Sequence, residues 1–252
     1  MSYRHTPVMP TEVLQYLGCQ PGKTYVDCTL GGSGHARLIL DNVMPGGVLI
    51  GIDQDQDAIR HGEVVLASFA PHVHLVHANF IDLREILMQL DITAVDGILL
   101  DLGISQDQLE SSGRGFSFKR DEPLDMRMNG GTGTTAEDLV NRMTERDLKR
   151  IFAEYGEERW AGRIARRIVE ERKRERIQSS LSLARIISRA IPKGNATHRR
   201  IHPATRAFMA LRIAVNQELE NLRIFLESAV NLLSPKGRLC VLSFHSLEDR
   251  IV

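Results

Sequence analysis

The chain has 252 residues and a formal net charge of zero, with 42% hydrophobic and 25% charged residues. This composition is ordinary for a soluble globular protein, and the length suits one large domain or two smaller ones. No apolar run is long enough to cross a membrane, and the N-terminus leads to no signal-peptide core. Cys19, Cys28 and Cys240 lack paired or metal-ligand spacing. We therefore expect reduced thiols, a cytoplasmic protein and no metal site.

The first part of the chain alternates short strand-like and helix-like segments. The predicted strands are 24–29, 48–53, 73–77 and 97–102, and the predicted helices are 36–42, 57–67 and 83–90. Short apolar strands separated by helices indicate a parallel α/β sheet with right-handed crossovers. Such sheets bind ligands at the carboxyl ends of their strands, so functional residues are expected there.

The segment between the first two predicted strands has the pattern of a nucleotide-derived cofactor site. The first strand leads into the small-residue loop Leu30-Gly31-Gly32-Ser33-Gly34-His35, and the second strand ends at Asp53. Glycines allow the backbone to approach a ligand, a helix N-terminus faces it, and a carboxylate after the second strand can bind a ribose diol. Dinucleotides and S-adenosylmethionine are the two cofactor classes bound in this way.

Two features of this segment separate the two cofactor classes. The dinucleotide fingerprint G-x-G-x-x-G needs a third glycine, and Arg37 stands in its place. The loop therefore suits a cofactor without a phosphate better than a pyrophosphate. Asp53 stands 22 residues after Gly31, which suits a ribose. These features favour S-adenosylmethionine, and an NAD-dependent oxidoreductase is the alternative enzyme.

Two further strand ends carry candidate residues. Phe80 follows the third strand, where its ring could pack on an adenine or belong to the core. Asp101 ends the fourth strand, where a carboxylate is costly unless it is solvated or paired. We therefore expect a functional role for Asp101.

Beyond Leu102 the alternation of strands and helices stops. Residues 103–135 are rich in glycine and charged residues and lack a clear periodicity. A helical pattern then resumes, with an apolar stripe formed by Trp160, Ile164 and Ile168. The simplest account is a Rossmann-like domain of the S-adenosylmethionine-dependent type, 1–105 and 214–252, with an inserted helical subdomain at 106–213.

The end of the chain returns to the α/β pattern. A helical stretch at 208–226 leads to a turn at 234–237 and a fifth strand at 238–244, eight residues before the last. A fold of this type usually continues with a helix and an antiparallel hairpin that closes one sheet edge. Their absence leads us to expect either a fragment or an edge that is covered differently.

The net charge of zero hides an asymmetry. Residues 141–212 contain 19 Lys and Arg against 8 Asp and Glu, a net charge of +11, so the remainder carries −11. A solvated helical face with local pairs such as Arg167–Glu171 would explain part of this charge. Basic clusters of this size more often mark a surface that binds a polyanion, and we predict that the insert binds nucleic acid.

Several runs of residues, in order along the chain, resemble those of the MraW/RsmH family. Besides the glycine loop they are Asp101-Leu102-Gly103-Ile104-Ser105, Arg114-Gly115-Phe116-Ser117-Phe118, Pro123-Leu124-Asp125-Met126-Arg127-Met128, Tyr155-Gly156-Glu157-Glu158, His202-Pro203-Ala204-Thr205-Arg206 and Ser243-Phe244-His245-Ser246-Leu247-Glu248-Asp249-Arg250. The family consists of bacterial methyltransferases that act on the exocyclic amine of a cytosine in small-subunit ribosomal RNA. The resemblance thus implies an S-adenosylmethionine-dependent rRNA (cytosine-N4)-methyltransferase that acts on assembled or nearly assembled 30S subunits.

The resemblance also implies which residues bind the cofactor, and most of them lie at the strand ends already singled out. They are Ser33, Gly34, His35, Asp53, Phe80, Asp101 and Gln108. Gln108 rests on the resemblance alone. We assign RNA binding to residues of the basic segment, namely Arg199, Arg200, His202 and Arg206.

Transfer of a methyl group to a cytosine amine requires the base to be extruded and the amine to be aligned with the methyl group. Many amino-methyltransferases carry Asp/Asn/Ser-Pro-Pro-Tyr/Phe after the fourth strand, but this chain has Asp101-Leu102-Gly103-Ile104 there. A stacking ring must then come from elsewhere or is not used, and the candidates are Phe116, Phe118 and Phe244. Asp101 and His245 are the candidate catalytic residues. The non-enzymatic alternative is an RNA-binding ribosome-assembly factor.

Overall fold

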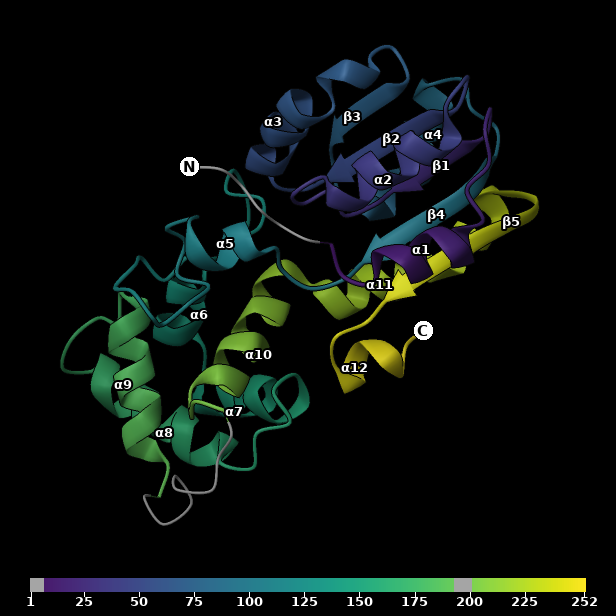
Figure 1. The fold of residues 1–252 in the computed structure, drawn as a ribbon. Helices are drawn as coiled ribbons and strands as arrows, with labels where there is room; N and C mark the ends of the chain where they lie inside the picture. The colour runs from purple at the N-terminus through teal and green to yellow at the C-terminus, as the bar shows by residue number, and fades with distance from the viewer. Residues whose placement is uncertain (1–6, 193–200) are drawn as a thin grey trace. The chain divides into compact units, whose positions relative to one another are not determined.

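The computed structural model describes residues 7–192 and 201–252. Its contacts divide the chain into an α/β unit, Met1–Ser105 with Leu219–Val252, and a helical unit, Gln106–Glu218. Each unit is described by itself (Figure 1). The division expected from the sequence places the return to the first domain at residue 214. That position lies inside helix α10 (Thr205–Asn216), which packs on other helices of the insert.

The α/β unit is built on a sheet of parallel strands, as predicted. The strands are β1 (Thr24–Asp27), β2 (Val48–Asp53), β3 (Val73–His77), β4 (Val95–Asp101) and β5 (Leu233–Leu242), in the order β3-β2-β1-β4-β5. Strand order reverses between β1 and β4, so the carboxyl ends of these two strands flank a topological switch point. A Rossmann-like sheet binds its ligand at this point.

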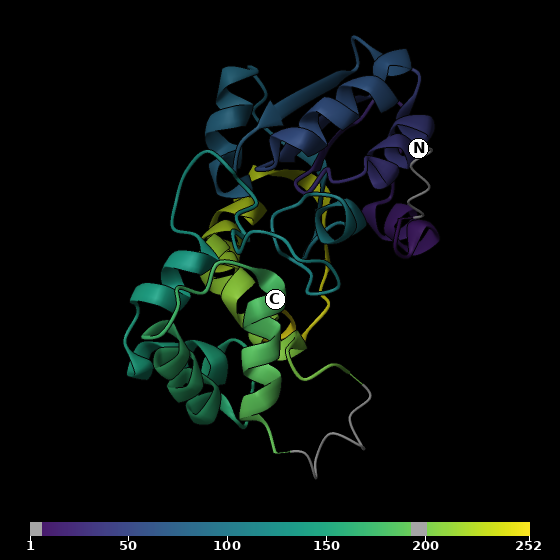
Figure 2. The ribbon, with the colours of Figure 1, turned by 90° about the vertical axis from the view of Figure 1, so that its left-hand side faces the viewer.

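Helices cover both faces of the sheet (Figures 1 and 2). One face carries α1 (Pro10–Leu17), α2 (Gly34–Val43) and α3 (Gln56–Val65), and the other carries α4 (Leu83–Gln89) and α11 (Glu218–Ala229). Neighbouring residues of a strand point to opposite faces, which explains why the strands read as continuous apolar runs. In β1, for example, Tyr25 packs with the first group of helices and Val26 with the second.

Strand β5 differs from the expected turn followed by a strand. Leu233 already pairs with Val95, and pairing resumes at Arg238 opposite Gly97. Residues 234–237 therefore bulge out of the strand, with Lys236 in the left-handed conformation at φ 70°. A short helix, α12 (Ser246–Asp249), follows the strand.

The described part of the helical unit contains α5 (Gln106–Glu110), α6 (Ala136–Arg142), α7 (Glu145–Glu154), α8 (Ala161–Arg172), α9 (Ser180–Ala190) and α10 (Figure 2). Side chains of Thr135, Thr144 and Ser179 accept hydrogen bonds at the N-termini of α6, α7 and α9. The unit's buried side chains include Leu148, Phe152, Ile164, Ile168, Leu183, Ile187, Phe208 and Leu211. Two members of the predicted apolar stripe are therefore buried, while the third, Trp160, is half-buried just before α8.

The predicted helical stretch at 208–226 is two helices. Gln217 ends α10 in the left-handed conformation at φ 52°, and α11 begins at the next residue. Arg212 spans the break with two hydrogen bonds of 2.8 Å to the carboxylate of Glu218. Continuous apolar spacing did not reveal this break. Within residues 7–192 and 201–252, no helix has both the length and the apolar character needed to cross a membrane.

Candidate cofactor site

Three carboxylates lie at the carboxyl ends of adjacent strands in the α/β unit. Asp27 ends β1, Asp53 ends β2 and Asp101 ends β4. The strands are parallel and neighbouring, so these acids gather at one edge of the sheet, on either side of the loop between β1 and α2. The three acids and the glycine loop therefore lie at the switch point of the sheet.

The loop between β1 and α2 is held open by two residues in the left-handed conformation. Gly31 has φ 46° and Ser33 has φ 61°. The N–H of Ser33 donates to the carbonyl oxygen of Leu30 at 2.7 Å, and the N–H of Gly31 donates to Asp53 Oδ2 at 2.9 Å. The acid on β2 thus fixes the conformation of the loop after β1.

Helix α2 begins without a side-chain cap. Its N-cap residue is Ser33, and the left-handed backbone of that residue makes no capping hydrogen bond. The Ser33 hydroxyl is buried and has no hydrogen-bond partner in the described part of the chain. The first N–H groups of a helix also lack intrahelical acceptors. The start of α2 therefore offers N–H donors to a ligand, with the dipole favouring a negative group, while the Ser33 hydroxyl is enclosed 3.2 Å from the position of a Cβ on Gly62.

Gly34 sits under the N-terminal segment of the chain. A Cβ atom on this residue would lie 3.1 Å from Cδ of Pro7. Such a contact is tighter than ordinary packing, so the glycine allows Pro7 itself to pack on the loop.

Asp53 retains acceptor capacity in addition to its role in the loop. Its Oδ2 accepts the Gly31 N–H, and its Oδ1 accepts the N–H of Asp55 at 2.8 Å. Burial raises the pKa of Asp53 to about 6, although these two hydrogen bonds act to lower it. A carboxylate has about four lone-pair positions, so two remain for the hydroxyls of a ribose.

Asp27 is a candidate that the sequence analysis did not single out. It is 1% exposed, and its Oδ1 accepts the N–H of Thr29 at 3.2 Å. Burial raises its pKa to about 7, and the charges of Asp101 and Asp53 act in the same direction. The Thr29 hydroxyl in turn accepts the N–H of Asp101 at 2.7 Å, which ties the ends of β1 and β4 together. An acid as the last residue of an apolar strand next to a glycine loop is the signal that could have revealed it.

His35 lies between the N-terminal segment and the fourth strand. Its imidazole is buried; Nε2 lies 2.8 Å from the carbonyl oxygen of Val8 and Nδ1 lies 3.5 Å from Oδ2 of Asp101. A carbonyl oxygen only accepts, so Nε2 carries a proton. The side chain thus contacts protein groups on both sides, and a contact of His35 with a cofactor is left to its backbone N–H.

The two remaining residues expected to bind the cofactor, Phe80 and Gln108, lie outside the glycine loop and the strand-end acids. Phe80 begins the 3₁₀-turn Phe80–Asp82 and packs edge-to-face on Phe225 of α11, with ring centroids 5.2 Å apart. It is half-buried, so a core role is evident and an adenine contact stays a prediction. Gln108 lies in α5 of the helical unit, and its role as a cofactor contact also stays a prediction.

His245 is engaged as the N-cap of α12. Its Nδ1 accepts the N–H of Glu248 at 3.4 Å, and its Nε2 lies 3.0 Å from the buried carboxylate of the same residue. The other oxygen of that carboxylate accepts the N–H of Phe244 at 2.8 Å. Both ring nitrogens therefore have structural contacts, and a catalytic role for His245 stays a prediction.

The expected RNA-binding residues belong to the helical unit. Arg199 and Arg200 lie outside the described residues. His202 is exposed and stacks on Phe118 with ring centroids 4.4 Å apart, and exposed Arg206 donates to the carbonyl oxygen of Glu157 at 2.9 Å.

The three rings considered for base stacking differ in exposure. Phe116 is 6% exposed, and Phe118 packs edge-to-face on Phe208 at 5.0 Å. Phe244 is 54% exposed, and the position of a Cβ on Gly103, just beyond β4, lies 3.7 Å from its ring. The exposure of Phe244 makes it the candidate that a base can reach most readily. In the described residues, no three His, Cys, Asp or Glu side chains are grouped in a way that could hold a metal ion.

A parallel Rossmann-like sheet with a glycine loop and acids at its switch point defines the class of cofactor-dependent enzymes to which S-adenosylmethionine-dependent methyltransferases belong. The chain belongs to the MraW methylase family, whose model matches residues 2–252. This membership confirms the resemblance and, with it, S-adenosylmethionine as the expected cofactor.

Known relatives match the whole chain. The "Ribosomal RNA small subunit methyltransferase H" of Desulfosudis oleivorans is 56% identical over 252 residues, which are 100% of this chain and 81% of that protein. The protein of the same name from Geobacter sulfurreducens is 55% identical over the same shares of both chains. Among solved structures, the fibrillarin of Aeropyrum pernix with bound S-adenosyl-L-methionine covers 36% of this chain and 37% of its own. Its TM-score of 0.30 and identity of 16% are too low to bear on the site.

Proposed function

We propose that this protein transfers a methyl group from S-adenosylmethionine to the exocyclic N4 amine of a cytosine in small-subunit ribosomal RNA. The observation that carries the proposal is the link between the glycine loop and the acid of β2, the 2.9 Å hydrogen bond from Gly31 to Asp53. It forms a ribose-type site directly beside the start of α2. The names of the relatives that are 55–56% identical over the whole chain support ribosomal RNA as the substrate.

The residues at the switch point fit the chemical groups of this cofactor. Asp53 would bind the ribose diol through its free lone pairs. The N–H groups at the start of α2, beginning beside Ser33, would bind the cofactor's carboxylate, because a helix N-terminus favours an anion. Asp27 and Asp101 would face its positively charged groups. When bound, S-adenosylmethionine supplies a methyl group on a positively charged sulfur.

Asp101 is the residue assigned to the target amine. A cytosine amine is a weak nucleophile because its lone pair is delocalised into the ring. A carboxylate that accepts a hydrogen bond from the amine holds it in one orientation and favours the pyramidal nitrogen that attacks the methyl group. Orientation of this kind contributes about 7–11 kcal/mol in well-aligned systems. The contact with His35 limits the positions that the Asp101 carboxylate can take.

We infer that assembled or nearly assembled 30S subunits are the substrate, and the experiment compares RNA in different states. Labelled methyl transfer is measured with 30S subunits from cells that lack the modification, with naked small-subunit RNA, and with DNA of matched length. Transfer to subunits but not to naked RNA or DNA is expected. Binding of subunits without any transfer would instead favour the ribosome-assembly factor, and transfer to naked RNA at the same rate would contradict the inferred substrate state.

A further inference from the structure

The segment between α7 and α8 carries a cationic surface that the cofactor site does not use. The guanidinium of Arg159 lies 4.6 Å from the centroid of the Trp160 ring, and that of Arg163 lies 5.4 Å from it. Both arginines are exposed and the tryptophan is half-buried. The indole therefore holds two guanidinium groups in position through cation–π contacts.

The charges of these two arginines are not neutralised locally. In residues 7–192 and 201–252, neither has a carboxylate within ion-pair distance. Two other arginines of α8 do have partners, since Arg166 lies 3.7 Å from Glu145 and Arg167 lies 2.7 Å from Glu171. The start of α8 thus retains positive charge that the middle of the helix does not.

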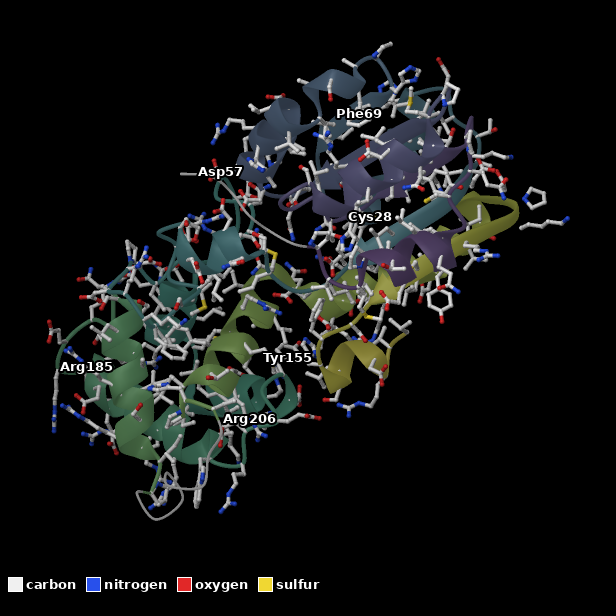
Figure 3. The ribbon with its side chains drawn as sticks, in the orientation of Figure 1. Cys28, Asp57, Phe69, Tyr155, Arg185 and Arg206 are labelled. Atoms are coloured by element: carbon white, nitrogen blue, oxygen red, sulfur yellow. The ribbon has the colours of Figure 1, made fainter. Side chains whose placement is uncertain are left out.

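Two more cations extend this surface. Lys149 of α7 lies alongside Gly162, where its Cδ and Cε are 3.7 Å from the position of a Cβ on that glycine. Arg206 reaches the segment from α10 and donates to the carbonyl oxygen of Glu157 at 2.9 Å. Figure 3 labels Arg206 and Tyr155 in this part of the helical unit. Both added cations are exposed.

The acids of the same segment do not cancel this charge. Glu158 is 3% exposed, and its Oε1 accepts the N–H of Trp160 at 2.9 Å, so it faces inward. Glu157 is the exposed acid of the segment. The exposed cations Arg159, Arg163, Lys149 and Arg206 thus stand against the exposed acids Glu157 and Glu154, the last residue of α7, which leaves a net positive surface beside an aromatic ring.

We propose that the side chains of Lys149, Arg159, Trp160, Arg163 and Arg206, here called the Trp160 surface, bind a single-stranded segment of the substrate RNA. The inference rests on the proposed function, because it names the surface by which such an enzyme holds its RNA. A guanidinium stacked on an indole keeps its N–H edge free for two parallel hydrogen bonds to a phosphate. The outer plane of such an exposed guanidinium can stack on an unpaired base, which a flexible strand can offer and a regular duplex cannot.

Trp160 itself makes the test specific. It is the single tryptophan of the chain, so intrinsic tryptophan fluorescence reports on this surface alone. The full chain is titrated with a short single-stranded oligocytidylate RNA, and affinity is measured in parallel from the fluorescence anisotropy of labelled RNA. We expect saturable quenching of the tryptophan, with an affinity that falls steeply as salt concentration rises.

Matched variants separate this surface from general electrostatic attraction. Arg163→Gln removes an unpaired charge, and Arg167→Gln removes an equal charge from the same helix that Glu171 already neutralises. We expect Arg163→Gln to weaken RNA binding about fivefold and to lower the salt slope by about one, while Arg167→Gln stays within about twofold of the wild type. Trp160→Leu should weaken binding more than Trp160→Phe, with folding of each variant checked by circular dichroism.

The outcomes distinguish a failure of this surface from a failure of the proposed function. Unchanged tryptophan fluorescence at saturating RNA would overturn the proposal that the Trp160 surface binds RNA. Equal losses of RNA affinity in Arg163→Gln and Arg167→Gln would overturn it as well. If the wild type still transferred methyl groups to 30S subunits, the proposed function would stand without it. Quenching by RNA together with an absence of methyl transfer would support the surface and overturn the function.

Discussion

The imidazole of His35 and the carboxylate of Asp101 face each other, with Nδ1 3.5 Å from Oδ2. Nε2 donates its proton to the carbonyl oxygen of Val8, so Nδ1 is the nitrogen that faces Asp101. Through this pair the N-terminal segment, the helix after the glycine loop and the end of β4 are held together. A residue expected to bind the cofactor is thus primarily a link between protein segments.

We predict that His35→Ala lowers the free energy of unfolding by about 2 kcal/mol or more, because it removes a buried side chain and leaves the Val8 carbonyl without its donor. Urea denaturation measures this loss. His74→Ala, which changes a half-buried histidine of β3, serves as the control and should cost less than about 1 kcal/mol. Equal stability of His35→Ala and the wild type would show that the Val8 and Asp101 contacts contribute little.

Asp53→Ala should weaken S-adenosylmethionine binding at least about tenfold. Hydrogen bonds to a charged group contribute roughly 1.5–3 kcal/mol, and this substitution also removes the acceptor that holds Gly31. Isothermal titration calorimetry measures the affinity, with Asp57→Ala as a control at an exposed acid on the first turn of α3. Wild-type affinity in Asp53→Ala would refute the assignment of the ribose to this residue.

The raised pKa of Asp27 predicts an unusual dependence of stability on pH. Its folded-state value of about 7 exceeds the ordinary value of 3.8, so the folded protein binds the proton more tightly than the unfolded chain does. The resulting stability is complete below about pH 4 and is lost as pH rises to about 7, and it amounts to on the order of 4 kcal/mol. Asp53, raised to about 6, acts in the same direction.

Denaturation of the wild type and Asp27→Asn at several pH values tests this prediction. The amide resembles the protonated acid, so we expect the variant to be more stable than the wild type at pH 7 and to differ little from it near pH 4. Acids that do not interact with Asp27 act equally in both proteins, including Asp125, where burial raises the pKa but hydrogen bonds from Arg127 bring it below its ordinary value. A difference between the two proteins that does not change with pH would contradict the raised pKa of Asp27.

His245 can be tested for a structural against a catalytic role. Asparagine is a good N-cap, so His245→Asn should keep most of the stability, whereas His245→Ala should lose about 1 kcal/mol. If the histidine acts only as the cap of α12, methyl transfer by His245→Asn should stay close to that of the wild type. A large loss of the transfer rate in a fully stable His245→Asn would instead establish the catalytic role expected from the sequence.

The sequence predicted the features that depend on local pattern. Apolar strands alternating with helices predicted the parallel sheet, and the glycine loop with Asp53 predicted the acid beside the loop. The bulge of β5 falls on the turn predicted at 234–237, which Pro235 and Gly237 mark, but the pairing of Leu233 with Val95 ahead of it was missed because it depends on the neighbouring strand. The helix break at Gln217 was missed because no proline or glycine marks it in the sequence. Asp27 was missed because the first strand was predicted to run to residue 29, which hid that the buried acid ends the strand directly before the glycine loop.

The contacts of His35 and His245 could not be predicted for a related reason. His35 lies in the glycine loop and His245 follows the fifth strand. From these positions the sequence predicted contact with the cofactor for His35 and a catalytic role for His245. Their partners, the Val8 carbonyl and the Glu248 carboxylate, depend on the path of the backbone. The roles of these histidines, like those of the acids at the strand ends, stay predictions.

The most direct test of the account is the identity of the modified nucleoside. Small ribosomal subunits from cells that lack the enzyme are treated with the purified protein and S-adenosylmethionine, and the RNA is digested and analysed by mass spectrometry against nucleoside standards. We expect a new N4-methylcytidine that is absent with Asp53→Ala and present with Asp57→Ala. Methyl groups found on another nucleoside, on a ring carbon or on a ribose hydroxyl would contradict it.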